Sequence, residues 1–173
     1  MHIQKRFEFK ELGNLNPGEL FCATVAGTRS IGFCMQQFSD LDRTRIALLS
    51  CPALSEDDCI FLDIESHQVV MSYGESWLID PIETAETHPG GGGQFIDRSG
   101  VITADRLGYT IRLRTEPRRL PSGHLRFNLD DKRTTSTEPS PVAAIFLDWD
   151  IWLDAEDRNR YGAVPFFQRR TKR

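Results

Sequence analysis

Several features that mark common classes of protein are missing from this sequence. No apolar run approaches the ~20 residues that a membrane-spanning helix needs. No apolar segment follows the basic residues of "MHIQKRFEFKEL", as it does in a secretory signal. Sustained 3.6-residue periodicity over several helical turns is also missing. We therefore expect a cytoplasmic protein with little helix and no association with a membrane.

The four cysteines form neither a metal motif nor a disulfide pattern. Cys22, Cys34, Cys51 and Cys59 follow one another at intervals of 12, 17 and 8 residues. None of these intervals is the CxxC spacing that zinc sites usually show. Three of the four lie inside apolar runs, "LFCATV", "IGFCM" and "DCIFL". We predict buried, reduced thiols that act as small hydrophobic side chains.

The four consecutive glycines at 90–93 do not fit a phosphate-binding loop. A Walker loop needs a Lys-Ser/Thr pair at its end, and no lysine is near. A dinucleotide fingerprint fails as well, because Phe95 stands where glycine or alanine belongs. The segment that follows, "QFI", is typical of a strand. The glycines therefore indicate a flexible loop between strands, near residues 81–93, with closure on a partner as the alternative.

The size and composition are those of one soluble globular domain. The chain has 173 residues, of which 39% are hydrophobic and 27% charged. A chain of this length buries roughly 70% of its unfolded surface, so it needs no metal or disulfide to stabilise a core. The net charge is −4, but residues 1–100 carry −8 and residues 101–173 carry +4. This asymmetry predicts a dipolar surface that can steer a charged partner.

Short apolar runs separated by turn signals predict the fold. The stretch 20–38 indicates a hairpin with its turn near Ala26-Gly27-Thr28, and 101–115 indicates another with its turn at Asp105–Gly108. The stretch 143–154, "AAIFLDWDIWLD", is typical of a last long strand. We predict a single all-β domain over residues 1–173, mainly antiparallel, either a sandwich or a barrel. One short C-terminal helix follows Asp154, and we expect a flexible loop near 130–141 and a basic tail at 166–173.

Arginines provide the most pronounced charge cluster. The stretch Arg106–Arg133 carries a net charge of +5. Within it, Arg112 and Arg114 alternate with apolar residues and share one strand face, while Arg118 and Arg119 follow in the adjoining turn. Arginine forks bind anionic groups through two parallel hydrogen bonds. We predict that these four arginines bind an acidic protein partner; nucleic acid is the less favoured ligand, because the whole chain is acidic.

The main alternative is a metal site in the last strand. Asp148 and Asp150 are two residues apart in "DWD", so on a strand they lie on one face, about 6.5–7 Å from each other. Carboxylate oxygens are the ligands that Mg²⁺ and Mn²⁺ prefer. His88 or His124 could complete the site if loops bring them near.

Two functions of different class follow from these patterns. The first is a non-enzymatic protein-binding or assembly module that uses the arginines and needs no cofactor; its specific partner is not defined by the sequence. A homodimer through the strand at 143–154 is a further possibility for assembly. The second is a hydrolase or transferase that depends on Mg²⁺ or Mn²⁺ bound by Asp148 and Asp150. We favour the first, since no catalytic motif such as GxSxG is present.

Overall fold

The computed structural model describes residues 6–54, 59–84, 87, 98–106, 108–115, 123–140 and 143–171. These residues form fourteen strands, the 3-10 helices η1 (Leu12–Asn14) and η2 (Ser39–Leu41), and the α-helix α1 (Ala155–Asn159). The first seven strands are β1 (Glu8–Glu11), β2 (Leu20–Val25), β3 (Thr28–Phe38), β4 (Arg43–Ser50), β5 (Ile60–Glu65), β6 (Val69–Gly74) and β7 (Leu78–Ile82). The other seven are β8 (Ile102–Asp105), β9 (Gly108–Thr115), β10 (His124–Asn128), β11 (Arg133–Thr135), β12 (Ala144–Phe146), β13 (Asp148–Trp152) and β14 (Phe167–Arg169).

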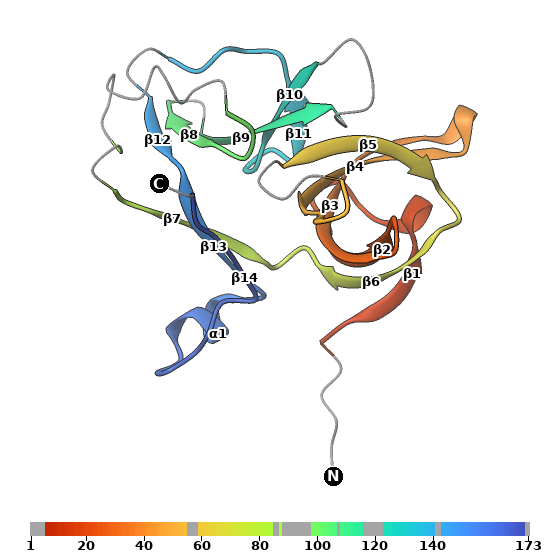
Figure 1. Ribbon diagram of the computed structural model, residues 1–173, viewed down its shortest axis with the longest axis horizontal. Coiled ribbons are helices and arrows are strands. Elements are labelled where there is room, and N and C mark those ends of the chain that lie inside the picture. The colour runs from red at the N-terminus through yellow and green to blue at the C-terminus, as the bar shows by residue number, and fades with distance from the viewer. Residues whose placement is uncertain are drawn as a thin grey trace.

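The strands form two sheets, which confirms the predicted all-β, mainly antiparallel fold. The larger sheet runs β1-β6-β2-β3-β4-β5-β9-β10-β11, with β8 beside β9 and β12 beside β8. The smaller sheet is β14-β13-β7. Of the described strand pairs, β5–β9 alone is parallel. Figure 1 shows the N-terminal strands curling around one another on one side and the smaller sheet lying on the other. The arrangement is sandwich-like rather than a closed barrel.

Both predicted hairpins are present, and their turns use backbone conformations suited to tight connections. Ala26 and Gly27 join β2 to β3 with φ values of 49° and 80°. Positive φ at both central residues is characteristic of a type I′ turn, whose twist matches that of the paired strands. In the second hairpin, Asp105 pairs with Gly108, whose φ is 98°. Glycine adopts this conformation without the steric penalty that a side chain brings.

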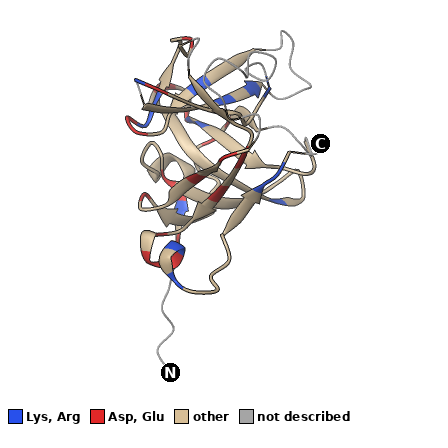
Figure 2. Cartoon of the chain, turned by 90° about the vertical axis from the view of Figure 1, so that its left-hand side faces the viewer, with Lys and Arg blue, Asp and Glu red and all other residues tan. Residues whose placement is uncertain are grey.

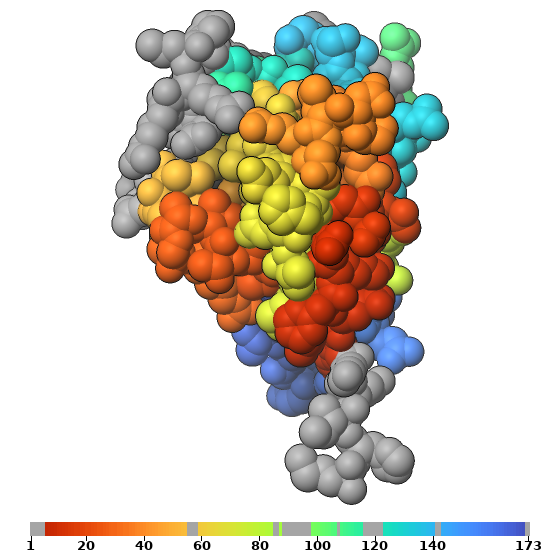
Figure 3. Space-filling view, turned by 90° about the vertical axis from the view of Figure 1, so that its right-hand side faces the viewer, coloured from red at the N-terminus to blue at the C-terminus, as the bar shows by residue number. Residues whose placement is uncertain are grey.

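Two large apolar cores lie within the described part of the chain, and the first of them joins the two sheets. The first lies between the sheets and contains Leu20, Phe33 and Phe127 from the larger sheet with Trp149 and Ile151 from the smaller one. The second lies inside the curled N-terminal strands, whose atoms, coloured red to yellow, make up most of the face seen in Figure 3. Successive residues of β2 enter different cores, because alternate side chains point to opposite faces of a strand. Burial on both faces explains why this strand reads as the nearly unbroken apolar run "LFCATV".

The stretch from residue 143 to residue 154 does not form the single strand predicted from its alternation. A bend at Leu147 divides it into β12, which pairs with β8, and β13, which pairs with β7 and β14. The chain therefore crosses from the larger to the smaller sheet at this residue. Ile145 and Trp149 are buried on either side of the bend, so the apolar pattern continues unchanged while the partner strands change.

The part of the stretch 143–154 that forms β13 is not available for the homodimer contact expected from the sequence. Ile151 is paired with Ile79 on β7 and with Phe167 on β14. Both edges of β13 are therefore occupied, and the strand cannot pair with its copy in a second chain. β14 itself takes up three residues of the segment 166–173 that the sequence indicated as a basic tail.

The single α-helix begins where the sequence indicates. The Asp154 carboxylate accepts a hydrogen bond from the Asp157 amide at 2.7 Å, which is the usual contact of an N-cap residue.

The strand β11 lies inside the stretch 130–141 that was predicted as a loop, and its sequence, Arg-Thr-Thr, has no apolar alternation to indicate a strand. The four glycines lie outside the described residues. Within the described part of the chain, no helix is long and apolar enough to cross a bilayer.

The predicted burial of the cysteines is confirmed. All four side chains are buried thiols, and no disulfide joins them. Cys59 and Cys34 are fully buried in the first and second cores respectively. They act as small hydrophobic side chains, as their apolar sequence surroundings indicate.

Gly32 marks a point where β3 and β4 lie too close for a side chain. A Cβ atom there would lie 2.2 Å from the carbonyl oxygen of Ala47, which is backbone and cannot rotate away. We expect Gly32→Ala to lower the free energy of unfolding by about 3 kcal/mol, because the strands must separate locally. Gly123→Ala is the matched control, since its Cβ would meet only Thr115 at 3.6 Å. Equal urea midpoints for the two variants would contradict this prediction.

Candidate functional site

Strands β9 and β10 bring basic side chains together on one face of the larger sheet. Their antiparallel register places Arg112 opposite Arg126 and Arg114 opposite His124. The alternate residues of these strands, including Ile111 and Phe127, are buried in the first core. Alternation therefore forces the four basic side chains onto the other face. We call these four residues, Arg112, Arg114, His124 and Arg126, the arginine face; Figure 2 shows blue on strands at the end of the molecule far from the N-terminus.

The arginine face overlaps only in part with the site predicted from the sequence. Arg112 and Arg114 share one strand face, as predicted. Arg118 and Arg119 lie outside the described residues. Arg126 and His124 belong to the face but were not assigned to the site. In the pattern "HLRFNL", His124 and Arg126 alternate with Leu125 and Phe127, which indicates that the two basic residues share a strand face. The sequence alone does not show that this strand pairs with β9, and without that pairing the two residues cannot be assigned to the site.

Arg126 is built into the sheet rather than exposed on it. Its exposed fraction is 7%, and one guanidinium nitrogen donates to the carbonyl oxygen of Thr137 at 3.4 Å. Another forms an ion pair with the Glu138 carboxylate at 2.5 Å. The Glu138 side chain, in contrast, is 78% exposed. A buried cation thus meets an acidic side chain that remains largely in solvent.

The charge of the arginine face acts on Glu138. The contact with the Arg126 guanidinium lowers the pKa of the Glu138 carboxyl, and the positive charge of Arg112 adds to this effect. Burial opposes it only in part. A carboxylate at this position is therefore stabilised in its ionised form by two arginines.

A hollow of about 440 Å³ opens beside these residues. Its lining includes Arg112, His124, Leu125, Arg126, Thr135 and Glu138. Hydroxyl groups and two guanidinium groups therefore meet in one concavity, on the face of the sheet opposite the first core, against which Leu125 packs. Such a lining suits an anionic side chain, because its oxygens find matching hydrogen-bond donors and positive charge there.

The two aspartates of the metal hypothesis are each engaged with the C-terminal segment. The carboxylate of Asp148 accepts a hydrogen bond from the Thr171 amide at 2.7 Å. That of Asp150 forms an ion pair with Arg170 at 2.7 Å. The sheet also places Asp80 directly opposite Asp150, where the Asp80 carboxylate accepts hydrogen bonds from Nε and Nη2 of Arg158, each at 2.9 Å.

These contacts give the carboxylates structural partners. Among the described residues, no group of three or more His, Cys, Asp or Glu side chains converges as metal ligands do. His88 lies outside those residues, and His124 lies on the arginine face in the larger sheet rather than beside β13. A divalent metal at Asp148 and Asp150 stays a prediction from the sequence, with no further ligand brought to it by the described chain.

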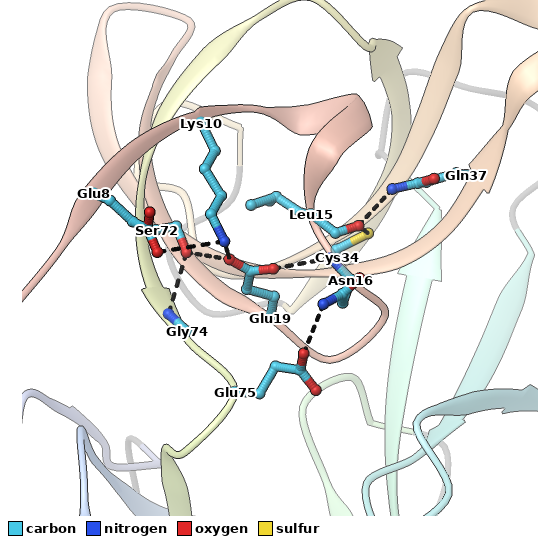
Figure 4. A network of polar contacts seen from close by, with 10 residues as sticks. All are labelled: Glu8, Lys10, Leu15, Asn16, Glu19, Cys34, Gln37, Ser72, Gly74 and Glu75. Carbon is cyan, nitrogen blue, oxygen red and sulfur yellow. Dashed lines mark hydrogen bonds and ion pairs between the residues drawn. The ribbon is translucent and has the colours of Figure 1, made fainter.

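Glu19 is a buried carboxylate that the sequence analysis did not identify. It is 1% exposed and accepts hydrogen bonds from Lys10 Nζ at 2.8 Å and from the Asn16 amide at 2.9 Å. The hydroxyl of Ser72 donates a further hydrogen bond to it. Figure 4 shows these groups converging on the carboxylate from β1, from β6 and from the segment before β2. These bonds come from three different segments, so the cluster is a structural junction between them.

The electrostatics of the Glu19 cluster argue against a reactive site. Burial alone raises the pKa of Glu19, but the hydrogen bonds from Lys10, Ser72 and Asn16 outweigh it and hold that pKa below 4.5. Burial, together with the charge of Glu19, raises the pKa of the neighbouring Cys34 thiol to about 12. A thiol that stays protonated at neutral pH is a poor nucleophile. Neither side chain has the pKa near neutrality that acid–base or thiol catalysis requires.

A second hollow, of about 380 Å³, lies between β7 and the β9–β10 hairpin. Aromatic side chains, among them Trp77, Tyr109 and Phe127, line it together with acidic residues and Lys132. Lys132 is paired with Glu75 and Asp80 with Arg158, while the Asp130 carboxylate accepts a hydrogen bond from the Tyr109 amide. Acidic groups therefore predominate in this hollow, whereas basic groups predominate among the described residues that line the hollow of the arginine face.

No family model, curated protein or solved structure matches this chain at a significant level. What the residues do must therefore be argued from their geometry. On that basis the protein is an all-β domain with two packed sheets and a basic concave face on one of them.

Proposed function

We propose that this protein is a non-enzymatic binding module whose arginine face holds an acidic segment of a partner protein. The observation that carries the proposal is the direct pairing of Arg112 with Arg126 at the edge of a hollow of about 440 Å³. Like charges directly opposite each other on neighbouring strands destabilise a sheet. An anionic side chain between the two arginines relieves this repulsion. Its binding free energy is therefore more favourable here than beside an isolated exposed arginine.

The chemistry of the face supports a carboxylate ligand. A guanidinium group offers parallel N–H donors that match the two oxygens of a carboxylate. The partial burial of Arg126 strengthens such a bond, because the effective dielectric constant is lower there than in bulk water. The hydroxyl-bearing residues of β11 lie beside the arginines in the same hollow. Glutamate or aspartate side chains of an extended segment fit both the charge and the polarity of this lining.

The charge distribution supports a protein partner over nucleic acid. The chain carries a net charge of −4, and its first hundred residues carry −8. A long polyanion meets repulsion from most of this surface, whereas a short acidic segment needs only the local basic face. The Glu138 carboxylate already pairs with Arg126 at this face. An acidic peptide therefore matches the local field without requiring a basic track along the molecule.

We expect the double substitution Arg112→Gln/Arg114→Gln to weaken binding of a fluorescein-labelled oligo-glutamate peptide by about tenfold to a hundredfold. The estimate corresponds to a total loss of about 1.4–2.8 kcal/mol, which is close to the contribution of one charged hydrogen bond. Fluorescence anisotropy at about 50 mM salt, where screening is weak, measures the affinity. Binding by the unmodified protein should also weaken as salt is added.

A charge-matched control tests whether the effect is local. Arg158→Gln/Arg160→Gln removes the same number of positive charges from α1 and its end, at the opposite end of the molecule from β10 (Figure 1). The proposal predicts nearly unchanged affinity for this variant. Equal weakening in both double variants would show that the peptide senses only total charge, and the arginine face would then not be the binding site.

A further inference from the structure

Glu138 is the one described carboxylate that reaches Arg126, and it belongs to the segment that follows β11. We propose that Glu138 occupies the position beside Arg126, here called the seat, that the partner's acidic side chain takes when it binds. An incoming glutamate or aspartate therefore binds by displacing Glu138. The inference rests on the proposed function and adds to it the chemistry of the bound group and a built-in competitor. The arginine face is then a closed carboxylate site whose resident ligand comes from the same chain.

The burial of the two partners is strongly unequal. The side chain of Arg126 is 8% exposed, whereas that of Glu138 is 78% exposed. The arginine is thus fixed in the sheet, and the acid reaches it from solvent. An ion pair with one member so exposed is stabilised little by its surroundings, because water solvates the carboxylate nearly as well once it leaves. Releasing the Glu138 carboxylate from Arg126 therefore costs little free energy, and another carboxylate can replace it.

The segment around Glu138 is held at both ends without Glu138 itself. The Thr137 amide donates to the hydroxyl of Thr135 at 3.1 Å. The Ser140 amide donates to the carboxylate of Asp105 at 2.9 Å. Between these anchors, Pro139 restricts the backbone further, because its ring fixes φ. The Glu138 side chain can therefore rotate away while the backbone of the segment stays in place beside the hollow.

The arrangement also explains how Arg112 and Arg126 coexist across the strand pair. The charges of both arginines act on the Glu138 carboxylate, so the acid compensates the repulsion between them while no partner is bound. An incoming acidic side chain takes over that role. The positive charges that bind the partner therefore do not destabilise the sheet while the protein is free.

The test compares Glu138→Gln with the unmodified protein in the oligo-glutamate anisotropy assay. Removing the competitor should tighten binding by about fivefold to tenfold, because the seat is then open in every molecule. Glu65→Gln is the matched control: it removes one negative charge from an exposed position at the end of β5. This control should change the affinity much less. Thermal unfolding of both variants checks that the fold is retained.

The outcomes separate this inference from the proposed function. If Glu138→Gln binds no more tightly than Glu65→Gln while Arg112→Gln/Arg114→Gln still weakens binding, the competitor role is wrong and the function stands. Weaker binding by Glu138→Gln likewise overturns the inference, since it means that Glu138 organises the seat. If neither the unmodified protein nor Glu138→Gln binds the peptide, both proposals fail. Tighter binding of a labelled single-stranded oligonucleotide than of the peptide would overturn the assignment of a carboxylate ligand.

Discussion

Glu19→Ala is expected to lower the free energy of unfolding by about 3–5 kcal/mol. The substitution removes the acceptor of three hydrogen bonds and leaves the Ser72 hydroxyl and the Asn16 amide without it. Breaking a buried ion pair by deleting one partner is strongly destabilising, because the other groups remain poorly solvated. The Lys10 ammonium, which is only partly exposed, also loses its closest carboxylate. Urea denaturation followed by tryptophan fluorescence measures the difference.

The same residue sets a predicted pH dependence. The pKa of Glu19 is lower in the folded protein than the ordinary value of 4.5, so the folded state binds its proton less readily than the unfolded state does. Its contribution to stability is therefore complete above pH 4.5 and is lost as the pH falls through the lower pKa of the folded state. The pKa values of Glu75 and Glu138 are also lowered, so all three carboxylates lose stabilisation in the same acidic range.

Two variants separate the Glu19 effect from general acid destabilisation. Glu19→Gln should show a smaller loss of stability between pH 6 and pH 3 than the unmodified protein, since the titrating group is gone. Glu11→Ala, an exposed position on β1, should unfold within about 0.5 kcal/mol of the unmodified protein. If Glu19→Ala were as stable as Glu11→Ala, the cluster would not hold β1, β6 and the segment before β2 together.

Trp149→Ala is expected to lower the free energy of unfolding by a similar amount, about 3–5 kcal/mol. Trp149 is fully buried on β13 and fills the space between the two sheets. Its indole N–H donates to the carbonyl oxygen of Gly100 at 2.9 Å. The ring also lies 5.8 Å from that of Phe167 and beneath the guanidinium of Arg169. Removing the side chain leaves a cavity and frees contacts on both sheets.

Conservative variants separate the volume of Trp149 from its hydrogen bond. Trp149→Phe removes part of the ring and leaves the Gly100 carbonyl without its donor, so we expect a loss of about 2 kcal/mol. Trp152→Phe is the control, because the indole N–H of Trp152 is buried without a hydrogen-bond partner among the described residues. Its replacement should change stability by less than about 1.5 kcal/mol. Equal losses for the two variants would contradict the role of the Trp149 bond in joining the sheets.

Local patterns were sufficient to predict the all-β class and the two hairpins. The turn at Ala26-Gly27 and the alternation of Ile111 and Leu113 with arginines are features of neighbouring residues, and the structure confirms both. The helix after Asp154 is equally local, since its cap contact spans three residues. Elements of this kind depend on backbone conformation and on which face is buried, and both leave a signal in the order of the residues.

Features that depend on distant partners left no such signal. The crossing between sheets at Leu147 changes the hydrogen-bonding partners while the apolar pattern continues, so the stretch reads as one strand. Glu19 lies in a short polar segment, and only the fold brings Lys10 and Ser72 to it. The arginine face was predicted through Arg112 and Arg114 alone. The register of β10 against β9 adds Arg126, and the segment after β11 supplies Glu138.

Amide chemical-shift mapping tests the binding proposal most directly. Uniformly ¹⁵N-labelled protein is titrated with unlabelled oligo-glutamate peptide, and the shift of each backbone amide is followed. The largest changes should fall on Arg112, Arg114, Arg126 and Glu138, with little change at Trp77 in the second hollow or at Asp150 on β13. No change at any concentration, or changes that gather at Trp77 or Asp150 and leave the arginine face unmoved, would contradict the proposal that this face binds an acidic partner.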